Sequence, residues 1–209
     1  MDVMHVEAIT RAEHARREAE RKRADGVFAS PAIAPDSSID PSPVQTFAIV
    51  LFERIDRPAI TARKISLREL VSLLTTFQQL TDKREGRCWS PAQYADGAST
   101  RGNAGVAAIT ALVFDLDRVP PDHDRLKHAY WIGHTTWSHR LESPKWRVIV
   151  PLAEPVTAAK WAETWHRARL ALCPEADPSC KDPSRAYWLP SHPPRTSVEA
   201  IVHEGALLN

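Results

Sequence analysis

The amino-acid sequence predicts an α+β fold in which helices cover one face of an antiparallel sheet. The first observation behind this prediction is the order of strand-like and helix-like segments, which is β-α-β-β-α-β over residues 107–190. The second is the apolar run "VAAITALV", which continues into "FDLD" and places two carboxylates at the end of a buried strand. Two such carboxylates must leave the core, so the sheet is expected to carry a polar surface on one side.

The first 43 residues are predicted to lie apart from this folded region. Residues 5–24 have the mixed charge of an exposed helix. The later stretch "SPAIAPDSSIDPSP" has the proline, serine and aspartate content of a linker. We therefore expect a charged helix and linker over residues 1–43 and one folded domain over residues 44–209.

The folded domain is predicted to begin with an N-terminal α/β extension. Residues 44–53, "VQTFAIVLFE", predict a strand. Residues 66–80 predict a helix that begins at Ser66, with Glu69 three residues on to complete a capping box. Residues 81–103 predict a long polar loop, and such loops in compact domains are often functional or disordered. The loop carries the basic residues Lys83, Arg84, Arg87 and Arg101.

The six elements of the main sheet follow this extension. They are a strand at 107–117, a short helix at 120–129, strands at 130–138 and 145–152, a helix at 157–172 with Thr157 at its N-cap, and a strand at 185–190. This is the βαββαβ order of RRM-like domains. In that arrangement the first and third strands lie at the centre, and the face of the sheet without helices is free.

Strand parity assigns side chains to the two faces of this sheet. The residues predicted to face the helices are Leu112, Phe114 and Leu116. Val113, Asp115 and Asp117 then point to the free face, where Arg147 on the neighbouring strand is expected to join them. Neighbouring ionised carboxylates repel each other, so a cation is required between or beside them.

Asp115 and Asp117 together offer hard oxygen ligands of the kind that Mg²⁺ and Mn²⁺ prefer. A site with two metal ions usually needs a third carboxylate to offset their charge. The segment "EADPSCKDPSR" supplies two candidates, Asp177 and Asp182, and the spacing leaves the choice between them open. Arg185 in the same segment, and Lys145 with Arg147, are cations suited to triphosphate or backbone oxygens.

With these parts in this order, the sequence resembles the archaeo-eukaryotic primase superfamily, in particular the primase-polymerases of phages, plasmids and other mobile elements. The motifs of that family are matched by "FDLD" with Asp115 and Asp117, by "WSH" with Ser138 and His139, and by "EAD" with Asp177. The resemblance covers about residues 45–195. The serine and the histidine are adjacent in this chain, so either Thr136 or Ser138 can take the place of the family's serine.

The resemblance implies a DNA primase or DNA polymerase, acting in replication of a mobile element or in repair by a two-metal mechanism. Asp115, Asp117 and Asp177 would hold two Mg²⁺ or Mn²⁺ ions. The nucleotide-binding residues would be Ser138, His139, Lys145, Arg147 and Arg185. The basic residues of the 81–103 loop would contact nucleic acid. The partners would be single-stranded or primed DNA, a deoxynucleoside or ribonucleoside triphosphate, and a helicase in trans or on a longer chain.

The sequence also allows two other functions for these residues and one other metal site. A metal-dependent nuclease or replication initiator also uses acids and histidines on antiparallel sheets. A catalytically silent RRM-like module would instead carry exposed aromatic residues at the centre of the sheet. A zinc site has little support, because no Cys-x-x-Cys or close histidine pair unites the possible ligands, which are His166, Cys173, Cys180 and His192.

Composition and charge argue against three other classes of protein, which are basic nucleic-acid coat proteins, membrane-spanning proteins and secreted proteins. The formal net charge of +1 argues against a generally basic nucleic-acid coat, so any polyanion must bind to a local cluster of positive charge. No apolar run is long enough to cross a bilayer, and the charged N-terminus does not resemble a secretion signal. Three cysteines make a poor disulfide framework, so we expect a cytoplasmic protein.

Overall fold

The structure, a computed structural model, describes residues 45–209. The predicted helix at 5–24 and the linker up to residue 43 lie outside the described residues. In order, the elements are β1 (Thr46–Phe52), β2 (Thr61–Ser66), α2 (Leu67–Thr75), β3 (Gln78–Gln79), η1 (Lys83–Glu85), β4 (Cys88–Ser90), β5 (Ala92–Tyr94), η2 (Asn103–Gly105), β6 (Val106–Asp117), α3 (His123–Leu126), β7 (Trp131–Thr135), β8 (Lys145–Thr157), α4 (Ala158–Leu172), η3 (Pro178–Lys181), β9 (Tyr187–Trp188), β10 (Ser191–His192) and β11 (Ala200–His203).

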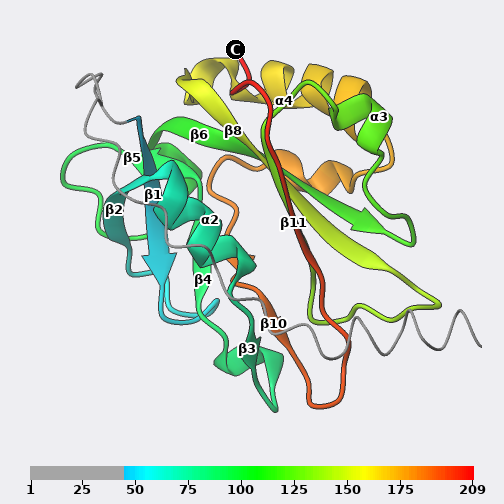
Figure 1. Cartoon of the computed structure of the whole chain (residues 1–209). Helices are drawn as coiled ribbons and strands as arrows, with labels where there is room; N and C mark the ends of the chain where they lie inside the picture. The colour runs from blue at the N-terminus through cyan, green and yellow to red at the C-terminus, as the bar shows by residue number, and fades with distance from the viewer. Residues whose placement is uncertain (1–44) are drawn as a thin grey trace, which may run out of the picture. The chain divides into compact units, whose positions relative to one another are not determined.

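The larger sheet has five strands in the order β11-β7-β8-β6-β5, and each neighbouring pair is antiparallel (Figure 1). The long strands β6 and β8 lie beside each other, as predicted for the first and third strands of the βαββαβ order. β7, the predicted second strand, pairs with the other side of β8. The chain is therefore a mixed α+β protein with antiparallel sheets.

Helix α4 covers one face of the larger sheet, as the strand parity predicts. Phe114 on β6 contacts Trp165 of α4, with 6.0 Å between ring centroids. The Trp165 indole N–H donates to the carbonyl of Val113 at 3.4 Å. Thr157 begins the helix, but its side chain makes no capping hydrogen bond. Burial of the two tryptophans of α4, Trp161 and Trp165, attaches the helix to the sheet.

The N-terminal extension forms a second, four-stranded sheet in the order β2-β1-β4-β9. The predicted strand is present as β1, and the predicted helix is present as α2 but ends at Thr75, so its last predicted turn instead contains strand β3. The capping box is confirmed, because Ser66 accepts from the Glu69 N–H and the Glu69 carboxylate accepts from the Ser66 N–H at 2.7 Å. Phe47 and Ile49 on β1 belong to the same buried cluster as the residues of β6.

Two expectations about strand pairing were wrong. The last predicted strand, which the structure limits to β9, pairs with β4 in the second sheet, so the βαββαβ arrangement is incomplete. The edge of β6 is paired instead with β5, a strand inside the predicted long loop at 81–103. That loop also contains β4, whose three residues are all buried. Because β4 and β5 are joined by Pro91 alone, they direct the chain from one sheet into the other.

The sequence predicted that the face of the larger sheet opposite the helices is free. This prediction is wrong in part, because the face opposite α4 is only partly uncovered. Phe77, just after α2, contacts His134 on β7 edge-on, with ring centroids 6.2 Å apart. β10 pairs in parallel with β3, and this pair forms a separate two-stranded sheet. The uncovered part of this face lies where β6 ends and β8 begins. No helix among the described residues is long and apolar enough to span a bilayer.

Candidate active site

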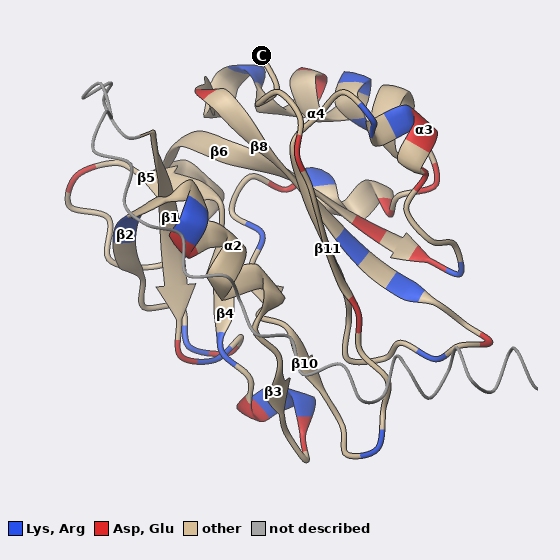
Figure 2. Ribbon diagram, in the orientation of Figure 1, with Lys and Arg blue, Asp and Glu red and all other residues tan. Residues whose placement is uncertain are grey.

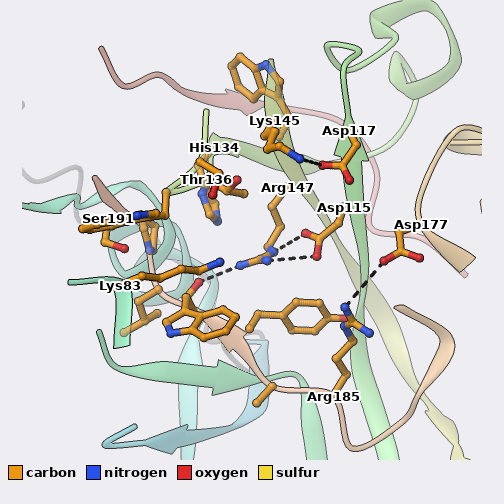
Figure 3. Close-up of a pocket in the computed structure, with 18 residues that line it drawn as sticks. Lys83, Asp115, Asp117, His134, Thr136, Lys145, Arg147, Asp177, Arg185 and Ser191 are labelled. Carbon is orange, nitrogen blue, oxygen red and sulfur yellow. Dashed lines mark hydrogen bonds and ion pairs between the residues drawn. The ribbon is translucent and has the colours of Figure 1, made fainter. Parts of the chain in front are cut away.

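A cavity of about 220 Å³ lies over the uncovered part of the larger sheet (Figure 3). The end of β6 and the start of β8 form one wall, and the chain from η3 to β10 forms another. Its charged lining residues are Lys83, Asp115, Asp117, Lys145, Arg147, Asp177 and Arg185. The structure therefore brings together most of the residues that the sequence predicted for the site.

The two aspartates on β6 each face a basic residue on β8. In the strand register Asp115 is opposite Arg147 and Asp117 is opposite Lys145, so acidic and basic residues lie side by side in Figure 2. Lys145 Nζ lies 2.7 Å from Asp117 Oδ1. Cross-strand neighbours have close Cβ atoms, which allows opposite charges to meet. In the described residues, Arg147 and Lys145 are thus the cations that the repelling carboxylates require.

Arg147 is held in place from three sides. Its Nε and Nη2 donate to the two oxygens of Asp115, at 2.7 and 3.2 Å, and its Nη1 donates to the carbonyl of Trp188 at 2.8 Å. The guanidinium also lies 4.8 Å from the ring centroid of Tyr187. Burial alone would raise the pKa of Asp115, but the charge and hydrogen bonds of Arg147 outweigh it and hold that pKa below its usual value.

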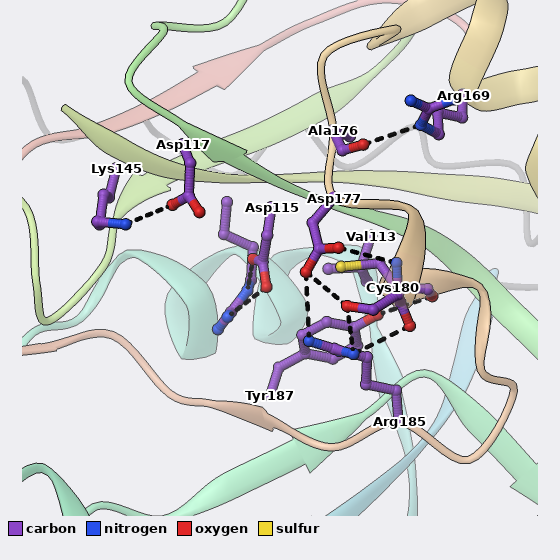
Figure 4. Close-up of polar contacts among 12 residues, drawn as sticks. Val113, Asp115, Asp117, Lys145, Arg169, Ala176, Asp177, Cys180, Arg185 and Tyr187 are labelled. Carbon is purple, nitrogen blue, oxygen red and sulfur yellow. Dashed lines mark hydrogen bonds and ion pairs between the residues drawn. The ribbon is translucent and has the colours of Figure 1, made fainter. Parts of the chain in front are cut away.

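Asp177 is the third acid of the cavity (Figure 4). Its backbone N–H donates to the carbonyl of Asp115 at 2.9 Å, which ties η3 to the end of β6. Its carboxylate caps η3 by accepting from Ser179, and hydrogen bonds from the Ser179 hydroxyl and N–H lower the pKa of Asp177. Arg185 Nη2 lies 3.9 Å from the same carboxylate.

Asp182, the other candidate for the third acid, lies elsewhere. Its carboxylate accepts hydrogen bonds from the N–H and hydroxyl of Ser184, at 3.1 and 3.3 Å. It is not among the residues that line the cavity, whereas Asp177 is. Position in the structure therefore separates two Asp-Pro-Ser segments that the sequence left equivalent.

The motif "TTWSH" is divided between the cavity and the interior. Thr136 and Ser138 both line the cavity. His139 does not line it, and only 5% of the residue is exposed. The His139 Nδ1 accepts a hydrogen bond from the Lys145 N–H at 3.2 Å, and the ring contacts Trp146 edge-on. A contact between His139 and a nucleotide stays a prediction from the motif.

His134 and Ser191 line the same cavity, and the sequence did not single them out. His134 is 1% exposed and lies opposite Arg147 in the strand register, so it extends the row of Asp115 and Arg147 across three strands. Burial, and then the charge of Arg147, lower the pKa of His134 to about 4. Strand parity could have found His134, because it faces the same side as Arg147.

Of the basic residues predicted to contact nucleic acid, Lys83 alone reaches the cavity. Arg84 forms an ion pair with Asp82 at 2.8 Å. The guanidinium of Arg101 lies 5.9 Å from the ring centroid of Phe52, and Arg87 is exposed on the surface. Nucleic-acid contacts by Arg84, Arg87 and Arg101 remain predictions.

The donor set of the cavity fits Mg²⁺ or Mn²⁺ in its chemistry, since Asp115, Asp117 and Asp177 supply only carboxylate oxygens. Each carboxylate has a basic partner, so an ion would have to replace some of these contacts. Asp117 is the most accessible, with 64% of its side chain exposed. Within residues 45–209 no three acidic, histidine or cysteine side chains are already gathered closely enough to hold one ion.

No family model and no curated protein matches the chain. Among solved structures, the chain is similar to the AEP domain of the primase-polymerase of cyanophage S-2L, with a TM-score of 0.44 and 12% sequence identity. The match covers 78% of this chain and 84% of that chain.

Proposed function

We propose that this protein is a template-dependent nucleotidyltransferase, a DNA primase or polymerase that needs Mg²⁺ or Mn²⁺. The observation that carries the proposal is the joint presence of Asp115, Asp117 and Asp177 in one cavity with four basic residues. Carboxylates bind divalent ions and basic side chains bind phosphate oxygens. A nucleotidyl transfer needs both kinds of group in one place.

The charge of the cavity supports an anionic substrate. Four basic residues line it against three carboxylates, so one positive charge remains. The chain as a whole has a formal net charge of only +1. The positive charge is therefore concentrated where a triphosphate would bind, as local recognition of a polyanion requires.

The side chains suggest a division of roles. To bind metal, the carboxylates of Asp117 and Asp177 would exchange their contacts with Lys145 and Arg185 for contacts with the ion. Lys145 and Arg185 would then be available to bind phosphate oxygens. Arg147 is fixed by Asp115, Trp188 and Tyr187, so its position does not depend on the ligand. Divalent ions bound at these carboxylates would lower the pKa of an attacking hydroxyl and neutralise charge on a departing pyrophosphate.

The competing functions predict other features or other products. A silent RRM-like module would present aromatic side chains at the centre of the sheet, but the central row consists of His134, Arg147 and Asp115. A metal-dependent nuclease would use the same carboxylates and would shorten nucleic acid instead of extending it.

A primer-extension experiment tests the proposal. The protein is incubated with a primed or an unprimed labelled DNA template, with deoxynucleoside or ribonucleoside triphosphates, and with Mg²⁺, Mn²⁺ or EDTA. We expect template-dependent lengthening that EDTA abolishes. Shortened products would support the nuclease, and an unchanged template in every metal condition would contradict both enzymes. Products on the unprimed template would show priming.

A further inference from the structure

Arg147 divides the cavity into two sides (Figure 3). Asp115 and Asp177 lie on one side, while Lys83, His134 and Ser191 lie on the other. The second side contains no carboxylate among the lining residues, and it faces two cations, Lys83 and Arg147. Burial and the nearby charge of Arg147 lower the pKa of Lys83, so an anion bound here would relieve an existing repulsion.

Three residues that line the cavity carry a buried polar atom without a partner among residues 45–209: His134 at Nε2, Ser191 at Oγ and Trp188 at Nε1. Of these residues, His134 and Ser191 are 1% and 4% exposed. A buried polar group without a hydrogen bond is costly, so such groups in folded proteins usually meet a ligand or a water molecule. Both residues belong to the lining of the cavity.

The hydrogen-bonding roles of these groups specify the ligand. His134 Nδ1 lies 2.9 Å from the carbonyl of Thr135, which can only accept, so Nδ1 carries the hydrogen of the neutral ring. Nε2 is then an acceptor and requires a ligand that donates one hydrogen. Lys83 and Ser191 donate, and Arg147 uses three of its five N–H groups on Asp115 and Trp188, which leaves two.

We propose that Lys83, His134, Ser191 and Arg147 form a metal-independent site for a terminal phosphate group that keeps one hydrogen. The phosphate oxygens accept from Lys83, Ser191 and Arg147, and the P–O–H hydrogen lies between an oxygen and Nε2 of His134. An internal phosphodiester has no such hydrogen and is excluded. The site rests on the proposed function only for the molecule that carries the phosphate, a nucleoside triphosphate or a 5′-phosphorylated strand.

Phosphate and sulfate test the site without any catalysis. At about pH 7.5 both are mainly dianions of similar size, but only phosphate keeps a hydrogen. Titration of each anion is followed by calorimetry in the absence of divalent ions. A hydrogen bond to a charged group predicts that phosphate binds about tenfold to a hundredfold more tightly than sulfate. Equal affinities, or no phosphate binding at millimolar concentrations, would overturn the site.

Three variants assign the contacts. His134→Gln offers an amide that can donate, so the preference for phosphate over sulfate should disappear. Lys83→Met and Ser191→Ala should weaken both anions, and circular dichroism confirms that each variant is folded. Unchanged phosphate affinity in Lys83→Met would contradict the proposal even if His134→Gln failed to fold. The matched controls are His166→Gln and Lys160→Met, both exposed on α4.

Larger ligands show which kind of molecule carries the terminal phosphate that binds at this site. A nucleoside triphosphate is compared with the nucleoside, and a 5′-phosphorylated oligonucleotide with its 5′-hydroxyl form, at about pH 6 and pH 7.5. The second pKa of a phosphomonoester is about 6, so binding should tighten at the lower pH. No preference for either phosphorylated ligand would reject a terminal phosphate. Because no turnover is measured, these results are independent of the primer-extension result.

Discussion

Asp115 on β6 and Arg147 on β8 form a two-bond ion pair at the centre of the cavity, with N–O distances of 2.7 and 3.2 Å. Only 8% of the Arg147 side chain and 22% of the Asp115 side chain are exposed. Removing one partner of a buried pair leaves an uncompensated charge. Asp115 therefore has a structural role in addition to any metal contact.

The first prediction concerns this pair. Arg147→Met should lower the free energy of unfolding by roughly 3–5 kcal/mol, because Asp115 would be left buried without a cation. The double variant Asp115→Asn with Arg147→Met should recover much of that loss. Urea unfolding followed by tryptophan fluorescence measures both. Lys145→Met is the control and should cost less than about 1 kcal/mol, since its partner Asp117 is exposed. Equal losses for the two single variants would contradict a structural role for the pair.

The second prediction concerns pH. The pKa of His134 is about 4 in the folded protein, against an ordinary value of 6.5. Between these values the unfolded chain binds a proton that the folded chain does not, so stability is lost as the pH falls from 6.5 to 4. At about 1.4 kcal/mol per pKa unit, the loss is roughly 3 kcal/mol.

Unfolding free energies measured across this pH range test the prediction. His134→Gln should flatten the decline, whereas His166→Gln should keep it, because His166 is exposed. The pKa of Asp115 is lowered from its ordinary value of 3.8, so the stability linked to Asp115 is lost only below that pH. This loss therefore lies outside the pH range from 6.5 to 4. Parallel pH profiles for wild type and His134→Gln would show that His134 is not held neutral by the fold.

The third prediction separates the two Asp-Pro-Ser segments. Asp177→Asn should reduce nucleotide addition by about a hundredfold or more, because it removes a carboxylate from the cavity. Asp182→Asn should leave the rate within about twofold, since Asp182 lies outside the cavity and asparagine can also cap a turn. Steady-state extension rates measure both. A larger effect at Asp182 would reverse the assignment.

The central part of this fold could be predicted from local patterns. The run from Val106 to Asp117 is long enough for strand parity to place Asp115 and Asp117 on one face. Ser66 and Glu69 likewise predict a helix start from a few residues, because a capping box acts locally. The cross-strand pairing with Arg147 required only the assumption that β6 and β8 are neighbours.

The remaining parts depend on contacts distant in the sequence. β9 has two residues and β4 has three, which is too short for a periodic pattern, so their pairing could not be predicted. Cys88, Trp89 and Ser90 are buried as a strand of the second sheet, although the surrounding loop is polar. His134 belongs to no motif in the sequence, and its place in the site follows only when strand parity is combined with its register opposite Arg147.

The central claim is that the carboxylates of this cavity serve nucleotide addition, and Asp117 tests it most directly. Asp117 is 64% exposed and its partner is Lys145, so Asp117→Asn should change the free energy of unfolding by less than about 1 kcal/mol. The matched control is Asp96→Asn, an exposed acid outside the cavity.

The measurement is primer extension by wild type, Asp117→Asn and Asp96→Asn at equal folded concentration with Mn²⁺. Loss of a metal-binding carboxylate should remove several kcal/mol of transition-state stabilisation. We therefore predict that Asp117→Asn extends the primer at least about a hundredfold more slowly, while Asp96→Asn matches wild type. A folded Asp117→Asn protein that extends the primer at the wild-type rate would contradict the account.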